Sequence, residues 1–263
     1  MALTFWKYEG LGNDFVVVEA DALMSAPRAV RLCDRRRGVG ADGVLSILPP
    51  RTPGAAAYMH LYNSDGSEAA MCGNGIRCVA RHLAERRGLS GELVIDTDAG
   101  PRRCLLHLGP GGAVEAVSVE MGPARHEGEQ TFEVGEERLV GQRISMGNPH
   151  AVFIGPSSLE RAARLGPFVE QAVPGGVNAG FASPRPGGLD LVVWERGAGL
   201  TDACGTGACA AAVAAVTAGL LPAGEPLEVR LPGGALRVTV APDRVGVLMR
   251  GPAERVFQGE TTL

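Results

Sequence analysis

The chain has 263 residues, 45% of them hydrophobic, and a formal net charge of −4, which is the composition of a globular protein with enough apolar material for one large domain or two ordinary ones. This charge gives no basis for binding nucleic acid, because the longest basic run is 35–37, three arginines that we interpret as a solvated helix end. The first ten residues, MALTFWKYEG, have neither a basic start nor a long apolar segment. We therefore expect no signal peptide and a cytoplasmic protein.

One segment is long enough to cross a membrane. Residues 203–224 carry no charge. They are mostly small residues, with no aromatic side chain and few Leu or Ile, so their transfer into lipid would gain little. We expect a buried helix closely surrounded by strands, and no membrane partner.

The cysteines and the single lysine narrow the chemistry. Six cysteines are present, at positions 33, 72, 78, 104, 204 and 209, with no Cys-x-x-Cys pair and no ligand spacing to the five histidines. We expect reduced thiols and no metal site. A pyridoxal-phosphate enzyme needs a lysine for its Schiff base, and Lys7, in a strand-like run, is the only lysine. The sequence thus argues against that cofactor.

The first half of the chain combines short strands with one long helix. Segment 38–43 has the spacing G-x-G-x-x-G, but a charged run precedes it and a strand follows, so we expect a loop and not a dinucleotide site. The expected strands are 3–8, 15–18, 44–48, 57–62, 92–96, 102–108 and 114–121, with a short helix at 29–36, turns at 63–66 and 109–112, and a long helix after Cys72.

The second half repeats this plan. Its expected strands are 131–134, 138–140, 142–146, 151–154, 189–195, 227–231, 235–240 and 245–250, with an interruption at 147–150, a strand end at 177–181, and helices at 159–168 and after Cys204. Many short strands with one long helix in each half form an α+β pattern, and we expect a sheet wrapped around each helix.

The two long helices begin in the same way. Segments 71–89 and 195–221 each contain a cysteine, a Gly-x-Gly turn and an apolar helix, half a chain apart. At a helix N-terminus, unpaired N–H groups and the dipole favour an anion, which lowers a thiol pKa from about 8.5 and can hold a carboxylate. Two helices that begin in this way indicate two similar halves, whose helix N-termini serve one shared site.

A plainer interpretation exists for each candidate residue. Free cysteines are commonly buried as small hydrophobes, which suits Cys78 and Cys209 inside their helices better than Cys72 and Cys204 at glycine-rich starts. Glu195 and Arg196 form either a surface pair or a clamp for the ammonium and carboxylate of an amino acid. The asparagines at turns and strand ends suit turn chemistry or a polar substrate cage, and these are Asn13, Asn63, Asn74, Asn148 and Asn178. His150 is either a loop histidine or a neighbour that tunes a thiol.

Six motifs together carry a family resemblance. They are GLGNDF (10–15), GVGADG (38–43), YNSDGSEAAMCGNGIRC (62–78), GNPH (147–150), VNAGF (177–181) and ERGAGLTDACGTGA (195–208). In order and over nearly the whole chain, they resemble the diaminopimelate epimerase family. The resemblance implies two pseudo-symmetric domains, each a strand-rich barrel around a central helix, with the active site in the cleft between them. We expect residues 1–113, joined by the tail 252–263, to form one domain and residues 114–251 the other.

The resemblance also implies the site residues. Cys72 and Cys204 are the two catalytic bases. Substrate-binding residues are Asn13, Asn63, Gly73, Asn74, Asn148, Asn178, Glu195, Arg196, Gly205 and Thr206, and the groups that modulate the thiols are His150 and Glu195. Two positions depart from the family: Gly43 stands where some members have a glutamine that contacts substrate, and Phe257 where members have a tyrosine at the dimer interface.

The implied reaction is the interconversion of LL- and meso-diaminopimelate, on the route to lysine and peptidoglycan, by a homodimer without cofactor. One thiolate removes the α-proton while the opposite thiol donates one, and the helix N-termini stabilise the carbanion. Proline and hydroxyproline racemases are the nearest alternative, disfavoured by Asn74, where those enzymes tend to have His, and by Glu195 and Arg196. A thiol redox or metal-binding module is disfavoured by the cysteine spacing.

Overall fold

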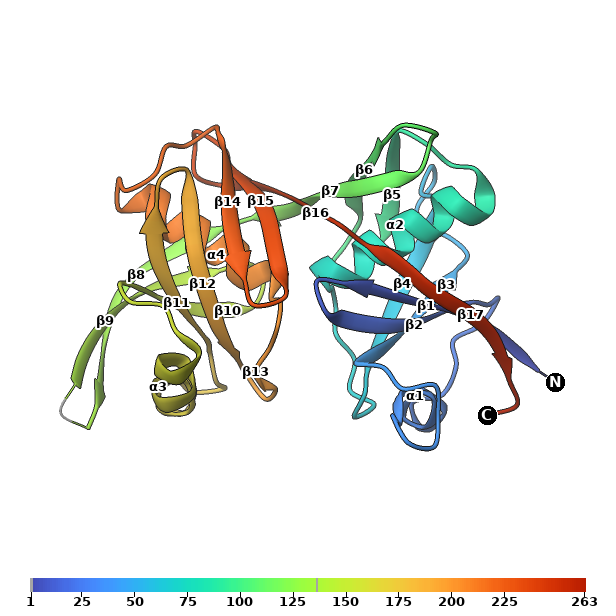
Figure 1. Ribbon diagram of the computed structural model, residues 1–263, viewed down its shortest axis with the longest axis horizontal. Helices are drawn as coiled ribbons and strands as arrows, with labels where there is room; N and C mark the ends of the chain where they lie inside the picture. The colour runs from blue at the N-terminus through green and yellow to red at the C-terminus, as the bar shows by residue number, and fades with distance from the viewer. Residues whose placement is uncertain (1, 136) are drawn as a thin grey trace. The chain divides into compact units, whose positions relative to one another are not determined.

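A computed structural model describes residues 2–135 and 137–263 and divides the chain into two compact units (Figure 1). Unit 1 holds the residues up to Val119 and again from Gly251 onward, and unit 2 holds Glu120–Arg250. The C-terminal segment thus belongs to the same unit as the first half of the chain, and the division falls a few residues after 113.

In unit 1 a mixed sheet surrounds helix α2 (Gly73–Arg87). The strand order is β17, β1, β2, β3, β4, β5, β6, β7, antiparallel throughout except for the parallel pairs β2–β3 and β4–β5. Helix α2 contacts strands from β17 and β1 across to β6, while the short helix α1 (Ala26–Cys33) packs over β3 and β4. The strands are β1 (Leu3–Gly10), β2 (Asn13–Glu19), β3 (Gly43–Leu48), β4 (Ala57–Asn63), β5 (Glu92–Asp96), β6 (Arg102–Leu108), β7 (Val114–Pro123) and β17 (Glu254–Thr261).

In unit 2 a second mixed sheet surrounds helix α4 (Gly205–Thr217). The strand order is β8, β9, β10, β11, β12, β14, β15, β16, antiparallel except for the parallel pairs β10–β11 and β12–β14. The strands are β8 (Arg125–Val134), β9 (Glu137–Ser145), β10 (Pro149–Ile154), β11 (Asn178–Arg185), β12 (Gly188–Glu195), β13 (Gly199–Leu200), β14 (Pro226–Leu231), β15 (Gly234–Val240) and β16 (Gly246–Gly251).

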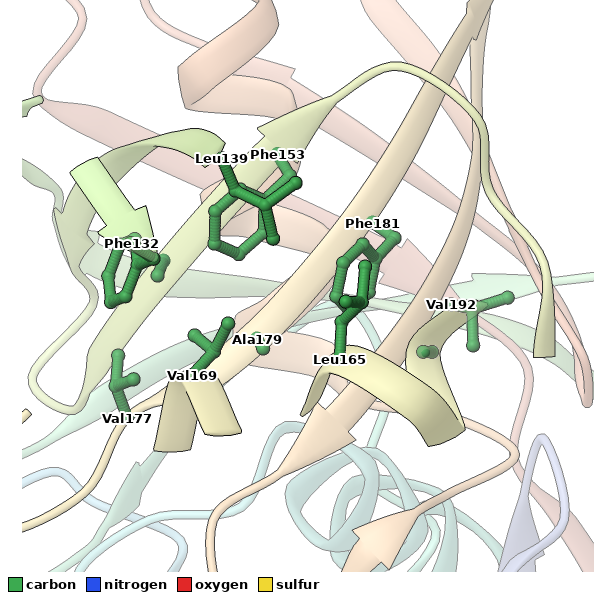
Figure 2. Packing of buried hydrophobic residues seen from close by; sticks show 11 residues of the cluster. Phe132, Leu139, Phe153, Leu165, Val169, Val177, Ala179, Phe181 and Val192 are labelled. Carbon is green, nitrogen blue, oxygen red and sulfur yellow. The ribbon is translucent and has the colours of Figure 1, made fainter. Parts of the chain in front are cut away.

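Helix α3 (Leu159–Gln171) packs against β11 and β12 of unit 2. Figure 2 shows its Leu165 and Val169 beside the aromatic side chains of the neighbouring strands. Phe153 and Phe181 stack with ring centroids 5.3 Å apart, and Phe132 meets Phe153 edge-on at 5.4 Å. Burial of these large rings fixes α3 on the sheet.

The two units have the same plan. The two orders of eight strands match pair by pair. In both, the third and fourth strands and the fifth and sixth strands are parallel, and the other neighbouring pairs are antiparallel. The outer helix follows the third strand in each unit, and the long helix follows the fifth. The two halves are therefore structural repeats of an α+β fold, as the sequence predicted. Strand β17 of unit 1 occupies the place that β8 has in unit 2.

Helix α4 is buried on all sides. Its residues Ala208–Val216 are buried throughout, because alanine, cysteine and valine side chains let strands approach closely from every direction. In the described part of the chain, no helix is long and apolar enough to cross a membrane.

Several expectations about elements were wrong in detail. The two-residue strand β13 was not predicted, and β8 begins at Arg125, before the expected range 131–134. The sequence missed β17, whose side chains are mostly exposed and so give no alternating pattern. Helix α1 starts at Ala26, with Pro27 in its first turn, and ends at Cys33, so the arginine run 35–37 is no helix end. Strand β9 continues through Gly141, and β10 starts at Pro149, where a missing N–H is tolerated at the first position of a strand.

Candidate active site

Cys72 lies at the N-terminus of α2. It is the N-cap residue, in extended backbone conformation, and its Sγ accepts a hydrogen bond from the N–H of Gly75 at 3.4 Å. Gly73 and Asn74 follow as the first, buried residues of the helix. The backbone N–H groups of this first turn point towards the end of the helix, where they can bind an anion.

Asn13 joins this helix start from strand β2. Its Oδ1 lies 3.3 Å from Nδ2 of Asn74 and 4.0 Å from Sγ of Cys72, and its Nδ2 donates to Oδ2 of Asp42 at 2.9 Å. A carboxylate can only accept hydrogen bonds, so the amide nitrogen of Asn13 must face Asp42. Its carbonyl oxygen is therefore fixed towards Cys72.

An ion network holds this asparagine. Arg35 bridges Asp14 at 2.7 Å and Asp42 at 2.8 Å, and the buried Lys7 pairs with Asp14 at 2.5 Å. Burial alone would raise the pKa of Asp14, but Arg35 and Lys7 lower it to about 2. Arg35, expected as a solvated residue, thus crosslinks the strands beside the cysteine.

Asn63 and Gly43 lie at the same edge of the unit 1 sheet, as Cα partners in β4 and β3. Nδ2 of Asn63 donates to Oγ of Ser67 at 2.9 Å, within the turn that leads to Cys72. A Cβ added at Gly43 would lie 2.7 Å from the carbonyl oxygen of Tyr62, so a longer side chain does not fit there without a shift of the backbone.

Cys204 has the same place at the start of α4. It is the N-cap residue, and its Sγ accepts from the N–H of Gly207 at 3.3 Å and lies 3.7 Å from Oγ1 of Thr206. Gly205 and Thr206 open the helix. Both cysteines therefore share one local geometry, in which Sγ meets the amide three residues on.

The pKa of Cys204 differs from the sequence expectation. Burial raises the pKa of this thiol well above its usual value, and the nearby carboxylate of Glu195 adds to this, while Thr206 and the Gly207 amide lower it. The helix start stabilises a thiolate, but burial outweighs it. Cys204 is therefore a protonated thiol in this state.

Glu195 is the group paired with that thiol. It ends strand β12, accepts a hydrogen bond from Oγ1 of Thr201 at 2.6 Å, and is hydrogen-bonded to Cys204. Burial raises the pKa of its carboxyl group, partly offset by Thr201 and Cys204. A carboxylate here can exchange a proton with the thiol.

His150 reaches Cys204 through two polar side chains. Its Nε2 lies 3.1 Å from Oδ1 of Asn148, whose Nδ2 donates to Oγ1 of Thr206 at 3.2 Å. Burial, with a smaller contribution from Arg196, lowers the pKa of His150 to about 3. The neutral imidazole donates to Asn148, so the Thr206 hydroxyl accepts from the amide and is free to donate to Sγ of Cys204.

Asn178 and Arg196 complete the unit 2 group. Asn178, at the start of β11, donates from Nδ2 to the carbonyl of Pro149 at 2.9 Å and accepts the N–H of Arg196 at 3.0 Å. The exposed guanidinium of Arg196 donates to the carbonyl of Gly175 at 2.9 Å.

The sheet pairings align the two groups. In unit 2 His150 pairs with Asn178, and in unit 1 Phe15 pairs with Gly43 at the equivalent place of the sheet. By this register Asn148 of unit 2 is equivalent to Asn13 of unit 1, and Glu195 is equivalent to Asn63. The titratable pair His150 and Glu195 thus corresponds to Phe15 and Asn63. Titratable side chains therefore occupy these two matched positions in unit 2, whereas the matched residues of unit 1 are a phenylalanine and an asparagine.

Sequence reasoning missed Asp42 and Thr201, which hold Asn13 and Glu195 through side-chain hydrogen bonds, and Glu170, which accepts hydrogen bonds from Trp194 and Gly197 on either side of the Glu195–Arg196 pair. Asp42 lies in a motif that carried the resemblance, whereas Glu170 lies in a helix with no motif. Among the described residues, no cluster of three His, Cys, Asp or Glu side chains could hold a metal ion.

Comparison with known proteins shows the family to which the chain belongs. The family model described as diaminopimelate epimerase matches residues 5–127 and 143–256. The chain belongs to the diaminopimelate epimerase family. It is 44% identical to the diaminopimelate epimerase of Synechococcus sp. (strain JA-3-3Ab), over 98% of both chains, and 42% identical to that of Desulforudis audaxviator, over 98% of this chain and 99% of the relative. The epimerase of Stutzerimonas stutzeri is 40% identical over the full length of both.

Solved structures share the fold at lower identity. A probable proline racemase from Agrobacterium radiobacter K84 has a TM-score of 0.80 at 17% identity, covering 99% of this chain and 93% of that one. A hydroxyproline epimerase from Agrobacterium vitis has a TM-score of 0.78 at 16% identity, covering 99% of this chain and 92% of that one. At this identity the likeness shows that the two-unit α+β fold of this family is the one present here.

Proposed function

We propose that this protein is a cofactor-independent isomerase that interconverts LL- and meso-diaminopimelate, a step of lysine and peptidoglycan precursor synthesis. The observation that carries the proposal is the repeated helix start, a cysteine N-cap with Sγ on the third amide, in a chain of this family. The relatives with 40–44% identity bear that activity in their names.

The chemistry follows from the two helix starts. Cys72 and Cys204 act on opposite faces of one α-carbon: one thiolate takes the α-proton, the C–H bond breaks, and the other thiol supplies the proton of the new C–H bond. The centre is inverted and the two cysteines end with exchanged protonation states, so no oxidant or reductant is consumed. At Cys204, we propose that the carboxylate of Glu195, which is hydrogen-bonded to the thiol, takes its proton.

Stabilisation of the carbanion falls to the helix amides. The substrate carboxylate next to the reacting carbon binds at Gly73 and Asn74 and at Gly205 and Thr206, where N–H groups are already oriented. The remaining polar groups hold the rest of the substrate, and these are Asn13, Asn63, Asn148, Asn178, Glu195 and Arg196. His150 keeps Asn148 and Thr206 in orientation.

The Lys7 ammonium is buried against Asp14 and the carbonyl of Gly40, which supports a structural role and chemistry without pyridoxal phosphate. We further propose a cytoplasmic homodimer that contacts its partner through β17, where Val256 and Phe257 are 57% and 46% exposed.

The direct test is an assay of protein dialysed against EDTA, with LL-diaminopimelate, L-proline and L-lysine as separate substrates and no added cofactor. We expect meso-diaminopimelate to form and neither of the other amino acids to racemise. Racemisation of proline in place of diaminopimelate would favour the proline racemase alternative, and a requirement for pyridoxal phosphate or metal would contradict the mechanism.

A further inference from the structure

We propose that Glu170, in the last turn of α3, is a positioning residue that holds the Glu195–Arg196 pair for the substrate. The inference rests on the proposed function, which makes this pair a substrate contact. Glu170 itself touches neither cysteine in any described hydrogen bond. It acts on the residues on either side of the pair.

A single carboxylate fixes both flanks of the pair. Oε2 of Glu170 accepts the indole N–H of Trp194 at 2.7 Å, and Oε1 accepts the backbone N–H of Gly197 at 2.9 Å. Trp194 immediately precedes Glu195, and Gly197 immediately follows Arg196. These two bonds therefore restrict the chain between Trp194 and Gly197 at both ends.

Helix α3 is built to receive Trp194. A Cβ at Gly166 would lie 2.4 Å from Cβ and Cγ of Trp194, so the indole packs where a side chain is missing. Residues 166 and 170 lie on one face of a helix, one turn apart. Packing at Gly166 and the hydrogen bond at Glu170 therefore grip the same indole.

The turn needs such an anchor because it is exposed. Residues 196–198 are exposed to solvent, and Gly197 has a positive φ of 77°. Within the turn, the N–H of Arg196 is held by Asn178 and that of Ala198 by the carbonyl of Glu195. The N–H of Gly197 goes to Glu170, which ties the turn to the helix.

The two members of the pair depend on this anchor unequally. The carboxylate of Glu195 is also held by Thr201 and Cys204, whereas the exposed guanidinium of Arg196 has one described bond, to the carbonyl of Gly175. Loss of Glu170 should therefore disturb substrate binding at Arg196 more than proton transfer at Cys204. It should raise KM more than it lowers kcat.

The test compares Glu170→Ala and Glu170→Gln with Glu160→Ala, a matched control in the exposed first turn of the same helix. With diaminopimelate, we expect Glu170→Ala to raise KM about tenfold, the effect of one well-placed hydrogen bond, with kcat within about threefold. Glu170→Gln keeps one acceptor oxygen and should lose less. Glu160→Ala should match the wild type.

A second measurement reads the anchor without the reaction. The chain has two tryptophans, so an NMR spectrum shows two indole N–H signals. In Glu170→Ala one should move upfield and exchange faster with solvent, as should the amide of Gly197, while the other indole signal stays.

An unchanged Trp194 signal, or a changed signal with an unchanged KM, would overturn the proposal. A wild-type protein that does not turn over diaminopimelate would instead contradict the proposed function. The NMR signals of the Trp194 indole and the Gly197 amide would then decide whether Glu170 holds this turn. If Glu170→Ala does not fold, the same readings apply to Glu170→Gln.

Discussion

The protonation of Cys204 is decided by competing effects at a single sulfur atom. A helix N-terminus stabilises an adjacent charge by about 0.3–1 kcal/mol when exposed and up to about 2 kcal/mol when partly buried. Burial of a charged group can shift its pKa by several units, each about 1.4 kcal/mol. Cys204 is buried and faces a carboxylate, so burial dominates. The thiol therefore needs a proton acceptor, and in the proposed mechanism this is Glu195, which is hydrogen-bonded to it.

The first prediction separates two catalytic cysteines from one. In Cys72→Ala or Cys204→Ala, the remaining thiolate can still remove the α-proton from its own face and return a solvent deuteron to that face. In D₂O, we expect each variant to label a different stereoisomer without inverting it. Inversion should fall by at least 10²–10⁴, the range typical for loss of one positioned acid or base. NMR and chiral chromatography measure both. Substantial inversion by either variant would contradict the assignment.

The second prediction concerns His150 and acid stability. Its pKa is about 3 in the folded protein and near 6.5 when unfolded, so between these values only the unfolded chain takes up the proton. Stability from this residue is thus complete above pH 6.5 and declines as pH falls, by up to about 1.4 kcal/mol per pH unit. Between pH 6.5 and 5, the free energy of unfolding should fall by about 1.6 kcal/mol less in His150→Gln than in the wild type.

Urea unfolding at several pH values measures this slope. His126→Gln, at an exposed histidine of the same unit, is the control and should keep the wild-type slope. Equal slopes in all three proteins would mean that His150 is protonated in the folded state.

Sequence reasoning predicted which residues form the site, and it could not predict the bonds that these residues make. The cysteine N-caps follow from local chain order, because glycines and an apolar helix come directly after them. Asp42, which accepts a hydrogen bond from Asn13, lies 29 residues away in the sequence. Glu170 lies 24 and 27 residues from Trp194 and Gly197, whose N–H groups donate to it. Such contacts depend on how the sheet folds back, which no local pattern encodes.

At the scale of elements, the repeat was predictable, whereas the two-residue strand β13 and the longer strand β17 were not. The strand and helix patterns of both halves gave two sheets around two helices. Strand β17 is polar and exposed, and its order comes from backbone pairing with β1, which leaves no alternation in the sequence. The repeat itself indicates that a strand is needed there, because β8 fills the equivalent place in unit 2.

The third prediction tests the contact between α3 and β12. Alanine favours a helix over glycine by about 1 kcal/mol, which would stabilise Gly166→Ala. The added Cβ would meet Cβ and Cγ of Trp194 at 2.4 Å, atoms close to the backbone that cannot rotate away. Overpacking typically costs about 1–3 kcal/mol.

We therefore expect Gly166→Ala to lower the free energy of unfolding by about 1–2 kcal/mol, measured by denaturant titration. The control Ala163→Gly, at an exposed position of the same helix, measures the propensity effect alone. A variant as stable as the wild type or more so would show that Trp194 can move away from α3.

At the scale of the whole molecule, the C-terminal segment links fold and assembly. Strand β17 completes the sheet of unit 1 by pairing with β1, and it carries two exposed apolar side chains, Val256 and Phe257. The ring of Phe257 touches Phe5 edge-on at a centroid distance of 6.0 Å. An ordered strand with exposed apolar side chains suits contact with another protein surface.

The fourth prediction follows from the proposed dimer. Phenylalanine keeps the aromatic ring of the family's tyrosine and lacks its hydroxyl group, so apolar burial must supply the binding free energy. Replacing a central buried side chain typically costs at least about 2 kcal/mol, which weakens a dimer about 30-fold. We expect sedimentation velocity to show a dimer for the wild type and a shift towards monomer for Phe257→Asp. Leu105→Asp, which introduces the same charge at a 44% exposed position of unit 1, should remain dimeric. A wild type that stays monomeric at all concentrations, or a Phe257→Asp dimer of unchanged affinity, would place any interface away from β17.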